Sequence, residues 1–321
     1  MRKKHFLFAS VLALLCGSST LHAQDFKLTS SGYFKNQGVD VMAFDDIYPE
    51  GHQGGVCIIM NGHRVATNGD IRLEATPGQW QPVPKQLDRK LGDNSNTPPA
   101  TLCYPDSSRH LTGFNPMIYP DLHLIYTVNV ESKGKNIEVT VDLDRPIPQE
   151  FIGKVGFNLE FFPGSLFGKP WIMDGQSGIF PQQPNSPLMT TQPNYLHTGN
   201  YHDGKKSLAD MDKLIGKGYS PIVADDIISE PYAKGTKFTS RPDDPYNKVT
   251  IESLSGDLQL FDGRMNHNNG WFVLRSNIKP GVTKGAVKWI ITPNVVADWM
   301  YQPVIQTSQI GYHPTQDKEA V

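Results

Sequence analysis

The sequence is poor in charge for its length. Lysine, arginine, aspartate and glutamate make up 19% of the 321 residues, and the formal net charge at pH 7 is −2. A protein that binds nucleic acid usually presents a strongly basic face to the phosphates. The near balance of charge, without a block of either sign, therefore predicts that nucleic acid is not a partner.

The familiar motifs of catalysis and cofactor binding are also missing. There is no Gly-x-Ser-x-Gly nucleophile elbow, no phosphate-binding loop, no His-Glu-x-x-His metal motif and no Cys-x-x-Cys pair. The acidic residues do not follow the spacing of an EF-hand calcium loop. We therefore expect no cofactor and no metal site.

Long hydrophobic runs are absent except near the N-terminus. Residues 6–15 are apolar and follow a start that carries three basic residues. With a small residue at Ala23, this pattern predicts a signal peptide over residues 1–23, and the apolar run is too short to span a bilayer. We expect a secreted or periplasmic protein without a membrane span. A lipid anchor at Cys16 is the alternative, although Leu15 stands where a lipoprotein signal has a small residue.

Cysteine is scarce as well, with three in the chain. Removal of the signal peptide would leave Cys57 and Cys103, which could form a disulfide in an oxidising compartment. Cys57 also lies in an apolar run, residues 56–60, where a small buried thiol is equally natural. The sequence leaves these two interpretations open.

Glycine and proline are plentiful, with 29 and 25 residues, and short segments of alternating apolar and polar residues lie between them. Such alternation is typical of half-buried strands, and its clearest examples are residues 122–130 and 137–143. Ten or more strand-like segments with long loops and little sign of helix predict an all-β protein. We expect a large antiparallel β-sandwich over residues 24–302, with a hairpin turn at Asn61-Gly62 and a linker into the next module at residues 298–303.

Two segments carry the first candidate ligand contacts. Residues 66–72 predict a tight turn with a positive φ at Gly69, and Asp70 and Arg72 beside it could contact a sugar or an ion. Trp80 lies in a proline-rich loop, where it could cover the core or stack on a pyranose ring. Concave sugar sites combine such aromatic faces with a few polar groups.

Two Asp-Gly pairs and a polar loop supply further candidates. The pairs at residues 174–175 and 262–263 are most simply junctions between a strand and a turn, but side chains beside them could also face a glycan. Residues 266–271 are rich in hydrogen-bonding side chains and could line a polar groove. The further glycan-contact candidates are Trp171, Asp174, Arg264 and Trp271.

Several acids are available for glycoside hydrolysis: Asp70, Glu160, Asp174 and Asp262. This reaction usually needs two carboxyl groups about 5–5.5 Å apart for retention or about 6.5–9.5 Å apart for inversion. No spacing in the sequence brings two of these acids together, and most acids of a secreted sandwich are solvated. We therefore expect no catalytic residue in this chain.

The last residues carry a distinct pattern: Gln309-Ile310-Gly311-Tyr312, then Pro314, Lys318 and Ala320-Val321. This pattern resembles the opening of the immunoglobulin-like module that precedes the catalytic domain in glycoside hydrolase family 9, the cellulase family. Residues 30–303 are similar to the large region ahead of that module in such proteins of Bacteroides-type bacteria. The matching pieces include Gly32-Tyr33-Phe34, residues 66–72, residues 156–161, Met173-Asp174-Gly175 and Asp262-Gly263-Arg264.

The resemblance implies an enzyme that hydrolyses β-1,4-glucans by inversion in an (α/α)6-barrel domain with an Asp-Ala-Gly-Asp motif. That motif does not occur in this sequence, so the family's catalytic residues match no position here. We expect an accessory N-terminal region of a polysaccharide-degrading hydrolase, with an incomplete immunoglobulin-like module at residues 303–321. Its expected partners are a downstream catalytic domain and a β-glucan-like polysaccharide.

Two alternatives stay open at this point. The sandwich could itself be a carbohydrate-active enzyme, with acids such as Asp70 and Asp174 in a cleft, or it could be a non-catalytic glycan-binding or surface protein. Convergent carboxyl groups in a cleft lined with aromatic rings would favour the first. Glycan binding without release of sugar would favour the second.

Overall fold

The computed structural model describes residues 25–46, 54–74, 77, 84–89, 100–104, 122–184, 230–265, 270–302 and 311–315. In these ranges the chain is all-β, with two large antiparallel sheets and three short 3-10 helices, at Gln149–Phe151, Pro163–Ser165 and Gly263–Met265. The expected all-β sandwich is thereby confirmed. No helix in the described ranges is long and apolar enough to cross a membrane.

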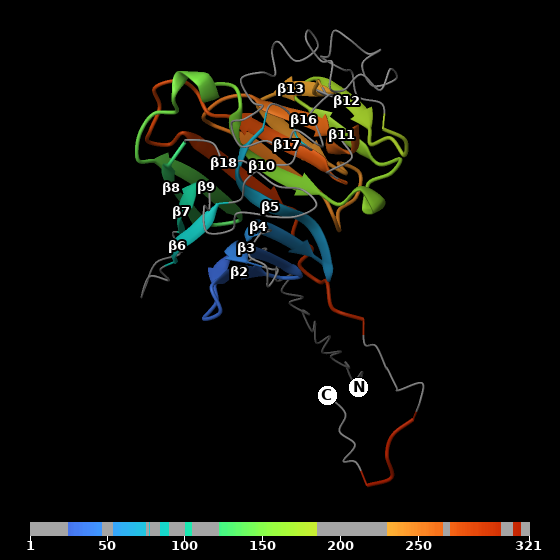
Figure 1. Ribbon diagram of the computed structural model, residues 1–321. Helices are drawn as coiled ribbons and strands as arrows, with labels where there is room; N and C mark the ends of the chain where they lie inside the picture. The colour runs from blue at the N-terminus through green and yellow to red at the C-terminus, as the bar shows by residue number, and fades with distance from the viewer. Residues whose placement is uncertain are drawn as a thin grey trace, which may run out of the picture.

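The first sheet has nine strands and combines segments from distant parts of the chain. Figure 1 shows it as an ascending series from β2 to β13. Its order is β1 (Lys27–Leu28), β2 (Tyr33–Asn36), β3 (Val39–Asp46), β4 (Gly54–Met60), β5 (His63–Leu73), β10 (Val155–Phe161), β17 (Phe272–Asn277), β16 (Leu258–Asp262) and β13 (Ala233–Gly235).

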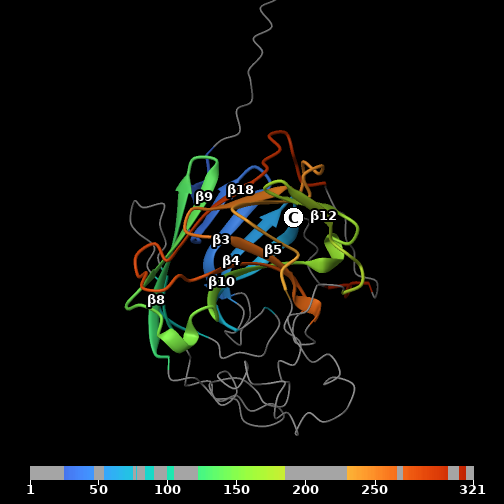
Figure 2. The same ribbon diagram turned by 90° about the horizontal axis from the view of Figure 1, so that it is seen from above.

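The second sheet also has nine strands. Figure 2 shows β8 and β9 at one side of the molecule and β12, an edge strand of this sheet, at the other. Its order is β12 (Gln176–Ile179), β11 (Pro170–Met173), β14 (Lys237–Ser240), β15 (Val249–Ser253), β18 (Val287–Pro293), β9 (Asn136–Leu143), β8 (Leu124–Lys133), β7 (Ala100–Tyr104) and β6 (Lys85–Arg89).

One continuous hydrophobic core joins the two sheets. Along β9 and β18 every second residue is buried, as the alternation in their sequences predicts. Phe157 of β10 meets Trp289 of β18 edge to face, with ring centroids 5.0 Å apart. Phe161 of β10 meets Phe238 of β14 in the same way, at 5.7 Å. These aromatic pairs bring the faces of the sheets together.

Strands β5 and β10 depart from this simple pattern. All seven residues of β10 are buried, and so are residues 65–73 of β5. Their sequences still alternate, so polar side chains such as Asn158 and Glu160 are enclosed on the face opposite Phe157. A half-solvated sheet would leave those side chains in water. The centre of the first sheet therefore contains a buried polar layer.

The structure confirms one predicted turn and corrects another. Asn61 and Gly62 connect β4 to β5 with φ values of 52° and 81°, as expected for an Asn-Gly hairpin turn. The turn expected at residues 66–72 is wrong, because these residues belong to strand β5. The positive φ falls on Asn68, at 55°, and the pairing register shifts next to it. Such a β-bulge uses the same residue types as a turn.

Several of the predicted features lie wholly or partly outside the described residues. Residues 1–23 and most of residues 303–321 lie outside them. Cys57 is a free thiol in the core, and burial, the largest influence, raises its pKa. The side chain of Cys103 is outside the described set.

Candidate functional site

A buried polar cluster lies where β5, β10 and β17 run side by side. Asp70 of β5 pairs with Asn158 of β10, which pairs on its other side with Arg275 of β17. Paired residues of neighbouring strands share one face of a sheet. The polar cluster, as the term is used below, consists of Asn68, Asp70, Arg72, Glu74, Asn158, Glu160 and Arg275.

Arg275 is held on all sides of its guanidinium. Nη1 donates to Glu74 Oε1 at 3.2 Å and to Asn158 Oδ1 at 2.9 Å. Nη2 donates to the carbonyl oxygens of Glu74 and Lys154, and Nε donates to Asn277 Oδ1. Asn158 in turn donates to Glu74 at 2.6 Å. This half of the cluster is a closed network in which the buried positive charge is matched by hydrogen-bond acceptors.

Arg72 occupies the other half of the cluster. Its Nη1 lies 3.9 Å from Asp70 Oδ2, and Asn68 beside it donates to Glu160 Oε2 at 2.5 Å. Burial alone would lower the pKa of Arg72, but the carboxylates of Glu160, Asp70 and Glu74 outweigh it and raise that pKa. Arg72 is therefore a buried cation that balances several carboxylates.

Asp70 also links the two sheets. Tyr126 of β8 donates its hydroxyl to Asp70 Oδ1 at 2.8 Å, and the N–H of Ile71 donates to the same oxygen at 2.6 Å. Burial raises the pKa of Asp70 from 3.8 to about 6, against the opposing effects of Arg72 and the two hydrogen bonds. Desolvation of the carboxylate thus outweighs its favourable contacts.

This pKa predicts a pH dependence of stability. A folded-state pKa above the unfolded value gives a stabilisation that is complete below pH 3.8 and is lost as pH rises through about 6. Between pH 5 and pH 7.5, Asp70 should therefore cost the protein on the order of 1 kcal/mol. Urea unfolding of the wild type and Asp70→Asn at both pH values measures this. The variant should show a smaller drop, and an equal drop in both proteins would contradict the assignment.

The cluster is closed to a polymer in solution. None of its side chains belongs to a residue that is more than 6% exposed. Asp70 and Arg72, predicted as ligand contacts, do come together with Glu160, but they face one another inside the protein. The described ranges contain no group of three or more His, Cys, Asp or Glu residues able to hold a metal ion.

The two ligand candidates on the second sheet, Asp174 and Trp171, make contacts within the protein itself. Asp174 follows β11 in a tight turn, at a φ of 49°, and accepts hydrogen bonds from the N–H groups of Thr236 and Lys237 at 2.8 and 3.0 Å. It thereby fastens this turn to the start of β14. Trp171 of β11 is in the core and only 6% exposed, so its ring has no free face for a sugar.

Arg264 forms a clamp at the end of β16. Its Nε and Nη2 donate to the two carboxylate oxygens of Asp262, both at 2.8 Å. Its Nη1 and Nη2 also reach the carbonyl oxygens of residues 182 and 181, and its guanidinium lies 4.4 Å from the Phe272 ring centroid. A bidentate, stacked arginine of this kind fixes a loop to a strand.

The two remaining tryptophan candidates are Trp271 and Trp80. Trp271 is half-buried and packs edge to face on Phe162, with centroids 4.4 Å apart. Trp80 lies outside the described residues, so its predicted stacking role stays a prediction.

An open pocket of about 610 Å³ lies at the hairpin end of the first sheet and was not anticipated from the sequence. Residues 61–63, Tyr246, Val296 and residues 298–302 line it. Residues 298–303 were expected to be a linker. Residues 296–302, which include most of that segment, instead pack against the sandwich and are called the C-terminal strap below. Two aromatic residues within the supposed linker were the signal that could have revealed it.

The strap is held by two glycine turns. Gln37 Nε2 donates to the carbonyl oxygen of Trp299. The Trp299 ring lies so close to Gly38 that a Cβ there would be 2.7 Å from it, and Tyr301 lies similarly over Gly62, at 3.3 Å. Both glycines have positive φ, 65° and 81°, so each supplies the turn conformation and the space for a ring.

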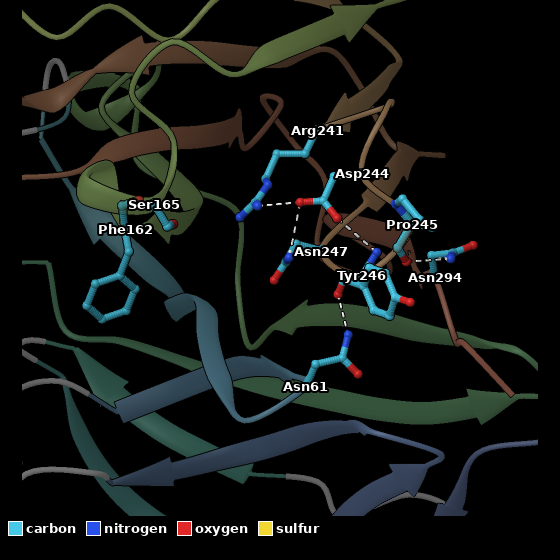
Figure 3. A network of polar contacts seen from close by, with 9 residues as sticks. All are labelled: Asn61, Phe162, Ser165, Arg241, Asp244, Pro245, Tyr246, Asn247 and Asn294. Atoms are coloured by element: carbon cyan, nitrogen blue, oxygen red, sulfur yellow. Dashed lines mark hydrogen bonds and ion pairs between the residues drawn. The ribbon is translucent and has the colours of Figure 1, made fainter. Parts of the chain in front are cut away.

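The opposite wall of the pocket is a loop organised by Asp244 (Figure 3). This carboxylate accepts hydrogen bonds from the Tyr246 N–H at 2.9 Å and from Asn247 at 3.1 Å, and it pairs with Arg241. Partial burial would raise the pKa of Asp244, but these contacts lower it. Asn61 donates to the Tyr246 carbonyl at 2.5 Å and ties the loop to the β4–β5 turn.

Comparison with protein-family models finds no match for this chain. Comparison with curated proteins likewise finds no significant relative.

Proposed function

We propose that this protein is a secreted accessory region of a polysaccharide-degrading glycoside hydrolase and has no hydrolytic activity of its own. The similarity of its motifs to the region ahead of the family 9 catalytic domain supports the enzyme context. The observation that supports the accessory role is that each acid considered for catalysis already has a partner within the sandwich.

Those partners are of different kinds. Asp70 accepts from Tyr126, Glu160 accepts from Asn68, and both carboxylates are buried. Asp174 accepts hydrogen bonds from the N–H groups of Thr236 and Lys237, where β14 begins. Asp262 is fully buried against Arg264. A catalytic acid and base must reach both the glycosidic bond and a water molecule. Carboxylates used in this way support a scaffolding or binding role.

An activity assay tests the proposal. The purified full chain, incubated with a soluble mixed-linkage β-glucan and with carboxymethyl cellulose, should release no more reducing sugar than buffer. A double variant, Asp70→Asn with Glu160→Gln, serves as the matched control for contaminating activity. Sugar release by the wild type that the double variant lacks would overturn the accessory role. Sequencing the gene past codon 321 gives an independent check, because the proposal expects an in-frame Asp-Ala-Gly-Asp domain there.

A further inference from the structure

We propose that the pocket at the C-terminal strap binds a neutral pyranose unit of a β-linked polysaccharide. The inference rests on the proposed function for the nature of the polymer, but its observations come from the pocket alone. Its volume of about 610 Å³ lies in the range of ordinary small-molecule sites.

The aromatic side chains of the pocket suit the apolar faces of a sugar ring. Tyr301 is 65% exposed and Tyr246 is 49% exposed. Trp299 meets Tyr301 at a centroid distance of 4.3 Å and an interplanar angle of 72°, so the two rings form a corner rather than a stack. Exposed aromatic rings that face solvent at a pocket are suited to C–H surfaces that also carry hydroxyl groups.

The polar side chains of the pocket define the charge of the ligand. Asn61, His63, Asp298 and Gln302 line it beside the rings, and they offer donors and acceptors for hydroxyl groups. Of the lining residues, only Asp298 carries a formal charge at neutral pH with histidine neutral. An acidic sugar would meet this carboxylate without a lysine or arginine in the lining to offset it. The site therefore favours neutral hexoses over uronic acids.

The walls of the pocket are organised before any ligand arrives. The strap is fixed on Gly38 and Gly62, and the backbone of Tyr246 is fixed by Asp244 and Asn61. Figure 3 shows the contacts of Asp244 and Asn61 converging on the loop that carries Tyr246. A wall that needs little ordering keeps more of the contact energy for binding.

Affinity electrophoresis of the purified full chain tests the site. Native gels containing soluble mixed-linkage β-glucan should retard the wild type, whereas gels containing polygalacturonate should not. Tyr301→Ala and Tyr246→Ala should each weaken binding about tenfold, the loss expected for one aromatic contact. Tyr301→Phe, which keeps the ring, should stay within about twofold of the wild type. Tyr312→Ala removes a comparably exposed tyrosine outside the pocket, 50% exposed, and should bind normally.

These outcomes test the pocket separately from the accessory role. Retardation that survives both alanine variants would place glycan binding elsewhere and overturn the pocket, while the accessory role would stand. Binding to polygalacturonate equal to that of β-glucan would overturn the neutral ligand. Absence of retardation in every gel would also overturn the pocket proposal. The accessory role fails only through the activity assay or the downstream sequence.

Discussion

Replacing Arg275 by methionine is expected to lower the free energy of unfolding by about 3–5 kcal/mol. Arg275 is 1% exposed and Glu74 is 2% exposed. Removing the guanidinium leaves the Glu74 carboxylate and the carbonyl oxygens of Glu74 and Lys154 without this donor. Methionine fills much of the same volume, so the loss reflects unpaired polar groups more than a cavity. Urea denaturation at pH 7 measures the change.

The control is an ion pair at the surface. Lys237 and Glu252 approach to 3.6 Å on neighbouring strands, with side chains 57% and 46% exposed. Lys237→Met should change stability by less than about 1 kcal/mol, because exposed pairs contribute little. If Arg275→Met were no more harmful than Lys237→Met, the polar cluster would not be a stabilising network.

Trp289→Ala should cost a similar amount, about 3–5 kcal/mol, because it opens a large cavity between the sheets. The indole is fully buried against Phe157. Its Nε1 donates to Ser276 Oγ at 3.0 Å, so the substitution also leaves that hydroxyl without its donor. Thermal or urea unfolding followed by far-ultraviolet circular dichroism gives the measurement.

Trp289→Phe separates the two contributions. Phenylalanine keeps an aromatic ring next to Phe157 but cannot donate to Ser276, so a loss of about 1–3 kcal/mol is expected. If both variants lost the same amount, cavity formation would not be the main cause. The inter-sheet contact would then be less important than the burial of Trp289 indicates.

The sequence predicted the strands better than the surroundings of their polar faces. Residues 155–161 form a strand, and Phe157 on it faces the second sheet. Glu160 was expected to be solvated, as most acids of a secreted sandwich are, yet Glu160 and its neighbour Asn158 are both buried. The partner of Asn158 is Arg275, 117 residues away, and local periodicity carries no information on such a contact. The burial of Asn158 therefore depends on long-range strand pairing and could not be predicted from the local alternation of residues.

Site prediction was limited by the same ambiguity of local signals. Residues 68–70 have the composition of a turn, and only the pairing with β4 and β10 shows that they form a bulge in β5. Asp70 and Arg72 were predicted as ligand contacts, whereas the contacts that the structure gives them are internal. The strap was not predicted because the rings of Trp299 and Tyr301 pack on Gly38 and Gly62, which lie more than 200 residues earlier.

The strand order of the first sheet has a consequence for synthesis on the ribosome. Glu74 lies 201 residues before Arg275, the cation that it binds. Hairpins β2–β3 and β4–β5 can form as soon as they emerge, but the centre of the sheet must wait for β17. Folding rates fall when native contacts join distant residues, and unfinished sheets expose edges that can aggregate. The sandwich can therefore be completed only late in synthesis, after β17 has left the ribosome.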